Sequence, residues 1–516
     1  MRSVYIYTIV LFFLCSACKE EKTSVSDEQA KVEFSQDRFR ESYRPQYHFT
    51  PPEKWMNDPN GLLFHNGTYH LFYQYYPEDI VWGPMHWGHA TSKDLIQWEH
   101  KPIALYPDEL GLIFSGSAVM DIDNTSGLGT KENPPMVAIF TYHLMAGEQA
   151  GRKDFQTQGI AYSLDEGDTW TKYDGNPVIG NDGIKDFRDP KVMWHEASGK
   201  WIMSLVAGDH AKFYSSSDLK DWKLESEFGR ENGAHGGVWE CPDLFPLQVE
   251  GSDEQQWVLL ISINPGAPNG GSGTQYFVGD FDGKKFTTTQ KETKWLDYGT
   301  DNYAGVTWNG LPDDERTFIG WMSNWTYARD TPTEVWRSAM TLPRKLTLHQ
   351  NDKGYYLKNF PVNQIENYTQ EPSLQTNGKA NVLTGEDFNQ NRINFEIDEK
   401  LQDFKVTFSN EAGEKLQLGY NAEKANFFVD RTASGKVDFQ ADFGKEVHFA
   451  PSIATSETEN TFSIFIDASS VEFFVNGGAV VMTEQIFPTQ PYTSISFEGD
   501  VTYKDITSSK IERIWD

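Results

Sequence analysis

The chain has 516 residues, and its 45 Lys and Arg against 75 Asp and Glu give a net charge of −30, which would repel a polyanion and argues against nucleic-acid binding. Its length exceeds what one hydrophobic core usually supports, so two domains are expected. The 16 tryptophans are more than a core needs, and amphipathic rings are common partners of sugar faces.

The N-terminus predicts a secretory signal. Arg2 precedes an apolar run from Val4 to Leu14, which is too short to span a bilayer. The small residues before Cys18 resemble a bacterial lipobox, although Cys15 stands where that motif usually has Leu. We therefore expect residues 1–18 to be a lipoprotein-type signal peptide. Lipidated Cys18 would hold the protein at the outer membrane or cell surface of a bacterium, and this lipid is the only membrane contact expected. The alternative is a signal peptide cut elsewhere, with Cys18 an ordinary residue.

Residues 19–42 are polar and charged, which predicts a flexible spacer. It begins with Lys19-Glu20-Glu21, which resembles the short acidic export tag of bacterial surface lipoproteins. With Cys15 removed and Cys18 acylated, only Cys241 would remain in the folded body, so no intrachain disulfide is expected.

Residues 43–350 are typical of many short strands separated by Gly, Asn, Asp and Pro turns, without long amphipathic helices. Strands are expected at 62–64, 69–73, 137–140 and 257–260. Three polar turn segments, near residues 92, 163 and 216, lead to Trp98, Trp170 and Trp222, and residues 281–286 look like a degenerate fourth copy. This repeat favours the blades of a β-propeller. Coincidental hairpin turns are the alternative.

Residues 365–516 predict a second all-β domain, a β-sandwich. Aromatic and apolar residues dominate 462–467 and 471–475, and Asn476-Gly477-Gly478 supplies a tight hairpin before the strand at 480–482.

Three acidic residues, each in a segment that contains a proline, are candidates for catalysis. Asp58 precedes a proline that restricts its backbone. Asp189 follows Arg188, which would keep it ionised. Glu240, between a Trp and a Cys, would have a raised pKa suited to donating a proton. Each also has an ordinary explanation, as a turn, an ion pair or a paired glutamate. Together they favour acetal cleavage, which needs two carboxylates in different environments.

These segments resemble glycoside hydrolase family 32, the levanases, inulinases and invertases. The residues that carry the resemblance are Trp55 to Gly61, Phe114 to Ser117, Arg188 to Pro190, Glu240 to Pro242, Trp82 to His89, Gly271 to Gly283 and Gly320 to Trp325. The resemblance implies a five-bladed β-propeller followed by a β-sandwich, a retaining mechanism, and no metal or other cofactor.

Carried over by position, the resemblance makes Asp58 the nucleophile, Glu240 the acid/base and Asp189 the transition-state stabiliser. It also implies a fructose subsite lined by Asn57, Gln74, Trp82, Phe114, Ser115, Arg188 and Trp321, with Ser117, Tyr303 and Trp325 as weaker candidates. Asn302 stands where many relatives have Phe before the tyrosine.

The implied activity is exo-hydrolysis of levan, inulin or both, with sucrose as a further candidate substrate, through a covalent fructosyl-enzyme. An endo-levanase, an invertase or a fructosyltransferase on the same scaffold remains open. A non-catalytic fructan-binding lipoprotein is the alternative of another class, and the three acids argue against it. The sequence leaves the oligomeric state open.

Overall fold

The computed structural model describes residues 38–378, 381–453 and 459–515. Cys18, the rest of the predicted signal peptide and the spacer up to residue 37 lie outside the described residues. At the end of the expected spacer, Phe39 stacks on Trp515 with ring centroids 4.3 Å apart. The described residues from Phe39 onward form one compact unit.

Helices are few and short in the described parts of the chain. They are α1 (Met145–Gln149) and the 3₁₀ segments η1 (Glu196–Ser198), η2 (Asp313–Glu315) and η3 (Asn363–Tyr368). None of them has the length and apolar character needed to cross a membrane.

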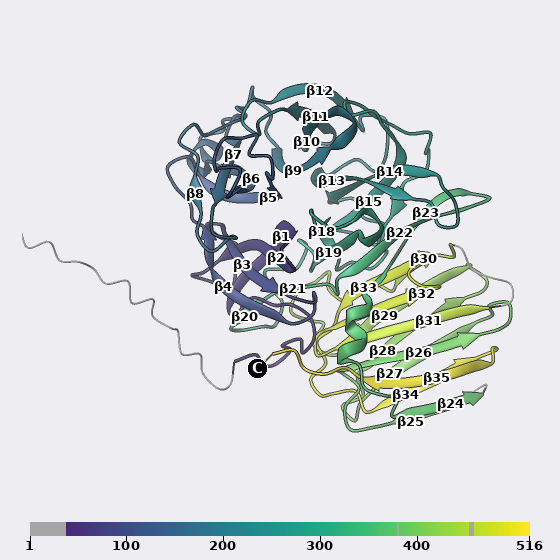
Figure 1. Ribbon diagram of the computed structural model, residues 1–516. Coiled ribbons are helices and arrows are strands. Elements are labelled where there is room, and N and C mark those ends of the chain that lie inside the picture. The colour runs from purple at the N-terminus through teal and green to yellow at the C-terminus, as the bar shows by residue number, and fades with distance from the viewer. Residues whose placement is uncertain (1–37, 379–380, 454–458, 516) are drawn as a thin grey trace, which may run out of the picture. The chain divides into compact units, whose positions relative to one another are not determined.

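Five antiparallel sheets follow one another along the chain, and each is a blade (Figure 1). The first contains β1 (Lys54–His65), β2 (Thr68–Tyr76), β3 (His86–Ser92) and β4 (Trp98–Leu105). The second contains β5 (Leu112–Met120), β6 (Met136–His143), β7 (Gln156–Ser163) and β8 (Thr171–Lys172). The third contains β9 (Phe187–His195), β10 (Lys200–Ala207), β11 (Ala211–Ser216) and β12 (Lys223–Phe228).

The last two blades carry small additions. The fourth contains β13 (Val238–Gln248), β14 (Gln255–Asn264), β15 (Gly273–Phe281), β16 (Phe286–Thr287) and β17 (Lys294–Trp295). The fifth contains β18 (Tyr303–Thr307), β19 (Thr317–Met322), β21 (Ala339–Met340), β22 (Arg344–Asn351) and β23 (Gly354–Pro361). The short β20 (Trp336–Arg337) pairs in parallel with β1, so the last part of the propeller is hydrogen-bonded to the first blade.

The first strand of every blade lies innermost. β1, β5, β9, β13 and β18 contact one another in sequence, and β18 contacts β1, which closes the ring seen in Figure 1. Residues near the N-terminal ends of these five strands therefore meet at one end of the propeller axis.

The tryptophan repeat marks equivalent hairpins in three blades. The indole Nε1 of Trp98, Trp170 and Trp222 donates in each case to the carbonyl three residues earlier, at 3.0–3.1 Å. All three hairpins join the third and fourth strands of a blade, and the degenerate copy at 281–286 joins β15 to β16 in the same way. The predicted repeat is confirmed.

The remaining strands form two six-stranded sheets, a β-sandwich. One sheet has the order β24 (Leu374–Gly378), β35 (Tyr503–Lys510), β26 (Asn391–Ile397), β31 (Asn460–Asp467), β32 (Ser470–Val475), β33 (Val480–Gln485). The other has the order β25 (Asn381–Thr384), β34 (Ser494–Gly499), β27 (Phe404–Ser409), β28 (Lys415–Asn421), β29 (Asn426–Ala433), β30 (His448–Pro451). Apolar side chains from both sheets share one core. The predicted all-β fold, a five-bladed propeller followed by a sandwich, is confirmed.

Charged groups are buried where sandwich residues contact the propeller. Arg344 of β22 lies 2.9 Å from both Asp297 and Glu472, and Arg431 of β29 lies 2.6 Å from Asp301. These side chains are at most about 1% exposed. Loss of one partner would leave a buried charge uncompensated, so the contact is sensitive to single substitutions.

Candidate active site

A pocket of about 410 Å³ lies at the end of the propeller axis where the innermost strands begin. Asp58 comes from β1, Ser115 from β5, Asp189 from β9 and Glu240 from β13, so four blades contribute to it. The ring arrangement thus brings together acids that lie far apart in the sequence.

Most of the predicted site residues line this pocket. They are Asn57, Asp58, Gln74, Trp82, Phe114, Ser115, Arg188, Asp189, Glu240 and Trp325. Trp321, Tyr303 and Ser117 are at most 1% exposed and do not line it. The Trp321 ring packs against Trp325, with centroids 4.9 Å apart, so it supports the pocket wall from within the core.

The Asp58 carboxylate is held at both oxygens. Asn57 Nδ2 donates to Oδ1 at 3.1 Å, and Ser115 Oγ donates to Oδ2 at 2.6 Å. Asn57 is itself held by Trp55 Nε1 at 2.7 Å. Burial and then the nearby Glu240 raise the pKa of Asp58, while the bonds from Ser115 and Asn57 oppose that rise. The result is a fixed carboxylate facing the pocket.

Asp189 adopts a left-handed backbone conformation, with φ of 63°. Its Oδ2 accepts a hydrogen bond from the backbone N–H of Cys241 at 3.0 Å. Burial raises the pKa of Asp189 to about 7, although Arg188 opposes the rise, and the Glu240 and Asp58 charges add to it. Arg188 favours the ionised form of Asp189, as predicted, but its nearest nitrogen lies 4.0 Å from Oδ2 and burial outweighs it, so the net shift of the Asp189 pKa is upward.

Glu240 lies in a polar setting. Arg188 Nε and Nη2 donate to its Oε1 at 3.1 and 2.9 Å, and the Tyr303 hydroxyl donates to its Oε2. The apolar surroundings expected from its chain neighbours are not found. Successive side chains on a strand point to opposite faces, and the Trp239 ring packs instead into a hydrophobic core, where its centroid lies 6.0 Å from that of Phe277.

Cys241 has a role that the sequence did not indicate. Its buried thiol lies 3.7 Å from both Asp58 Oδ2 and Asp189 Oδ2, so its single S–H can donate weakly to either carboxylate. Burial raises the pKa of the thiol well above its usual value. The group therefore stays protonated beside the two acids.

Several pocket residues were not found from the sequence. They are His143, Glu148, Phe155, Gln156, Asp186, Val238, Asn264 and Arg329. Asp186 binds Arg188 Nη1 at 2.8 Å, and its position two residues before Arg188 was an available signal. His143 stacks on Phe114, with centroids 4.2 Å apart, and comes from a strand end that carries no motif.

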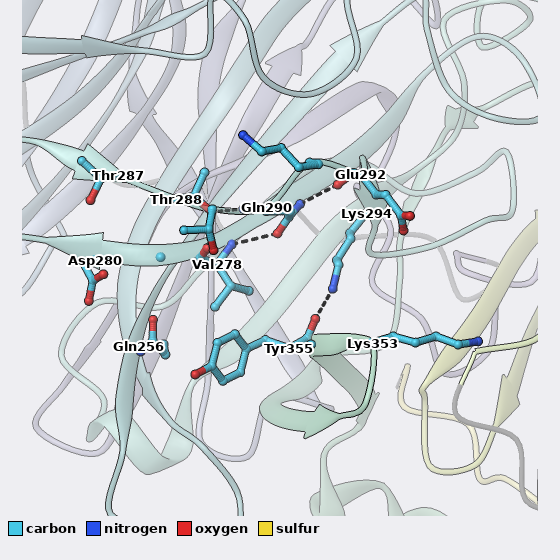
Figure 2. Close-up of a pocket in the computed structure, with 14 residues that line it drawn as sticks. Gln256, Val278, Asp280, Thr287, Thr288, Gln290, Glu292, Lys294, Lys353 and Tyr355 are labelled. Atoms are coloured by element: carbon cyan, nitrogen blue, oxygen red, sulfur yellow. Dashed lines mark hydrogen bonds between the residues drawn. The ribbon is translucent and has the colours of Figure 1, made fainter.

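A larger cavity of about 760 Å³ lies beside the fourth and fifth blades (Figure 2). Its two acids, Asp280 and Glu292, lie well apart, and the Gln290 amide between them is bonded to backbone groups of Val278 and Glu292 (Figure 2). It lacks the adjoining carboxylates of the axial pocket. Paired-acid chemistry is thus assigned to the axial pocket.

Glycoside hydrolysis requires two carboxylates in different environments, and this pocket contains two with different partners. Asp58 is fixed by neutral donors, and Glu240 is bound by a guanidinium and a phenol. Over residues 38–378, 381–453 and 459–515, no group of three or more His, Cys, Asp or Glu has the arrangement of a metal site.

Comparison with known proteins gives consistent matches. The Glycosyl hydrolases family 32 N-terminal domain matches residues 48–361, and the family 32 C-terminal domain matches residues 360–514. A levanase of Bacillus subtilis is 46% identical over 92% of this chain and 72% of the relative. An extracellular exo-inulinase of Aspergillus niger is 43% identical over 87% of this chain and 90% of the relative.

Solved structures agree with these matches. The exo-inulinase of Aspergillus awamori superposes with a TM-score of 0.86 at 39% identity, covering 92% of this chain and all of that one. A beta-fructofuranosidase of Schwanniomyces occidentalis complexed with fructosyl-erythritol gives 0.82 at 31% identity, covering 92% and 99%. The chain belongs to glycosyl hydrolases family 32 and is a glycoside hydrolase.

Proposed function

We propose that the protein is a retaining fructan β-fructosidase that releases fructose from the ends of levan or inulin chains, and from sucrose. Matched relatives are named levanase, exo-inulinase and beta-fructofuranosidase, which supports a β-fructoside substrate. The observation that carries the proposal is that Asp58 and Glu240 line one pocket and are held by different partners.

In the proposed reaction, Glu240 protonates the glycosidic oxygen while Asp58 Oδ attacks the anomeric C2 of fructose. The C2–O bond breaks, and a covalent fructosyl-enzyme forms. Water then attacks C2, Glu240 takes its proton, and the Asp58 ester bond breaks to release fructose. Two inversions at C2 give retention of configuration.

The other pocket residues would bind the fructosyl unit. Asp189 accepts hydrogen bonds from sugar hydroxyls and stabilises the transition state, and Arg188 orients Glu240. Trp82 and Phe114, with ring centroids 6.1 Å apart, offer apolar surface to the sugar. The pocket volume is at the small end for ligand sites, which favours a terminal sugar over an internal segment of a chain.

The test is incubation with levan, inulin and sucrose, with chromatography of the products over time. Free fructose from the earliest time points is expected. An early ladder of oligosaccharides without fructose would support an endo-levanase instead, and cleavage of sucrose alone would support an invertase.

We also propose that residues 1–18 direct export, that Cys18 is lipidated, and that residues 19–42 are a spacer between the anchor and the catalytic domain at 43–350, which the sandwich at 365–516 follows. The apolar run Val4 to Leu14 and the small residues before Cys18 support this, and matched relatives are described as extracellular. Labelling with a lipid precursor should tag the wild type but not Cys18→Ala. A tagged variant would rule out Cys18 as the attachment site.

A further inference from the structure

The loop that leads into Tyr303 is bound to the sandwich. Backbone N–H groups of Tyr298 and Asp301 donate to the carbonyls of Val481 and Thr483, at 2.8 and 3.1 Å. Val481 and Thr483 belong to β33, the edge strand of its sheet. The loop at 296–302 therefore covers a sheet edge that would otherwise be unpaired.

Two loop carboxylates complete this attachment. Asp297 accepts hydrogen bonds from Thr483 N at 2.9 Å and Thr483 Oγ1 at 2.6 Å. Asp301 accepts one from Gln485 N at 2.8 Å. The Asp297 and Asp301 carboxylates thus accept from backbone N–H groups of β33, while backbone N–H groups of the loop donate to carbonyls of the same strand. One short segment therefore satisfies both the N–H and the C=O groups along this edge of β33.

The approach is close enough to require glycine at position 299. A Cβ atom there would lie 2.1 Å from the carbonyl oxygen of Thr483 and 2.2 Å from its nitrogen. Contacts of that length are forbidden, and the atoms in conflict are backbone atoms. Any side chain at this position would force the loop and β33 apart.

The same network reaches the residue next to Tyr303. Asn302 Nδ2 donates to Asp297 Oδ2 at 3.1 Å, and Asp297 Oδ2 also accepts from Arg344 Nη1 at 2.9 Å. Asn302 is 1% exposed, so its amide has no alternative partner in water. Tyr303 then begins β18, and its buried hydroxyl donates to Glu240.

We infer that the β-sandwich orients the acid/base of the propeller: β33 fixes the 296–302 loop through Thr483 and Asp297, and the loop fixes the Tyr303 hydroxyl on Glu240. Tyr303, Asn302 and Thr483 are positioning residues. The inference rests on the proposed function, since it requires Glu240 to be the acid/base.

Tyr303 is suited to orienting Glu240 because its hydroxyl stays protonated and so remains a hydrogen-bond donor. Burial, followed by the charge of Glu240, raises the pKa of Tyr303 well above the usual value for tyrosine. A hydrogen bond donated to a carboxylate favours its ionised form over its protonated form. Loss or displacement of the phenol should therefore change how the enzyme responds to pH, which a general loss of stability would not do.

The experiment compares Tyr303→Phe, Thr483→Val and their double variant in the full chain. Tyr492→Phe is the matched control, since it removes one buried hydroxyl bond, to Ser434 O at 2.7 Å, inside the same sandwich. The measurements are kcat and KM on inulin and on an aryl fructoside with a good leaving group, and the pH profile of kcat/KM. Circular dichroism and Tm show that each variant is folded.

Tyr303→Phe and Thr483→Val should each lower kcat on inulin roughly 2- to 30-fold. The loss on the aryl fructoside should be smaller, because a good leaving group needs less help from the acid. Both variants should move the basic limb of the profile to higher pH, by about half a unit or more. In the double variant the shift should equal that of Tyr303→Phe alone, since Thr483 acts through Tyr303.

A normal profile in Thr483→Val, an additive shift in the double variant, or an equal shift in Tyr492→Phe would overturn the inference. If Thr483→Val does not fold, Asn302→Leu replaces it, with the same expectations. Failure of the proposed function is distinguishable from these outcomes, because wild type would then release no fructose or Glu240→Gln would keep normal activity on inulin.

Discussion

Arg188 donates from Nε and Nη2 to one oxygen of Glu240, at 3.1 and 2.9 Å, and lies 4.0 Å from the carboxylate of its chain neighbour Asp189. The guanidinium therefore interacts more strongly with Glu240, the proposed acid/base, than with Asp189, the proposed transition-state stabiliser. Asp186 binds its remaining Nη1 at 2.8 Å and fixes its plane.

Arg188→Lys should lower kcat on inulin roughly 10- to 100-fold, because a lysine supplies the charge but not two N–H groups aimed at one oxygen. KM should change less than kcat. Steady-state kinetics beside Arg152→Lys, which alters an exposed pair with Asp154, would check this. Equal activity of the two variants would contradict the assignment.

Asp58 and Glu240 should respond differently to substitution. Asp58→Asn should abolish turnover on every substrate, since no covalent intermediate forms. Glu240→Gln should lose about 10²–10⁴-fold on levan or inulin, whose poor leaving group needs the proton. It should retain more on an aryl fructoside, where added azide would capture the intermediate. Near-normal turnover of either variant on inulin would refute the proposed division of roles.

Asp189 should make stability depend on pH. Burial raises its pKa from near 3.8 to about 7, so across that interval the folded protein holds a proton that the unfolded chain has released. Its ionisation therefore costs stability progressively as pH rises from about 4 through 7. The Tm of Asp189→Asn minus that of wild type should become more positive from pH 4 to pH 8. Asp352→Asn, on an exposed turn, is the control. A difference that does not vary with pH would contradict the raised pKa.

The contribution of His48 to stability should also fall as pH rises, but over a higher pH range. Burial disfavours its charge, but hydrogen bonds to Asp467 and Glu472 outweigh this and raise its pKa to about 9. Its contribution is thus complete below pH 6.5 and is lost as pH rises through 9. His48→Asn should cost about 3–5 kcal/mol at pH 6 and less at pH 9.5, measured by denaturant unfolding. His65→Asn is a suitable control, and a cost that grows with pH would refute the assignment.

The sequence alone was enough to predict the class of fold and the three acids. Strand and turn patterns are local, so 462–467 and 471–475 could be recognised as strands, and the spacing of Trp98, Trp170 and Trp222 indicated equivalent hairpins. The segments around Asp58, Asp189 and Glu240 were identifiable because proline and neighbouring side chains shape their local backbone. Roles for these acids remain predictions.

Only the tertiary structure decided what surrounds each acid. Which groups lie near a side chain depends on strands that are distant in sequence, so the partners of Glu240 come from β9 and β18 rather than from Trp239 beside it. Trp321 could be named from its motif, but its place beneath Trp325 depends on how the fifth blade packs. Likewise, the pKa of Asp189 follows from burial, which arises only when the five innermost strands close into a ring and exclude water from its carboxylate.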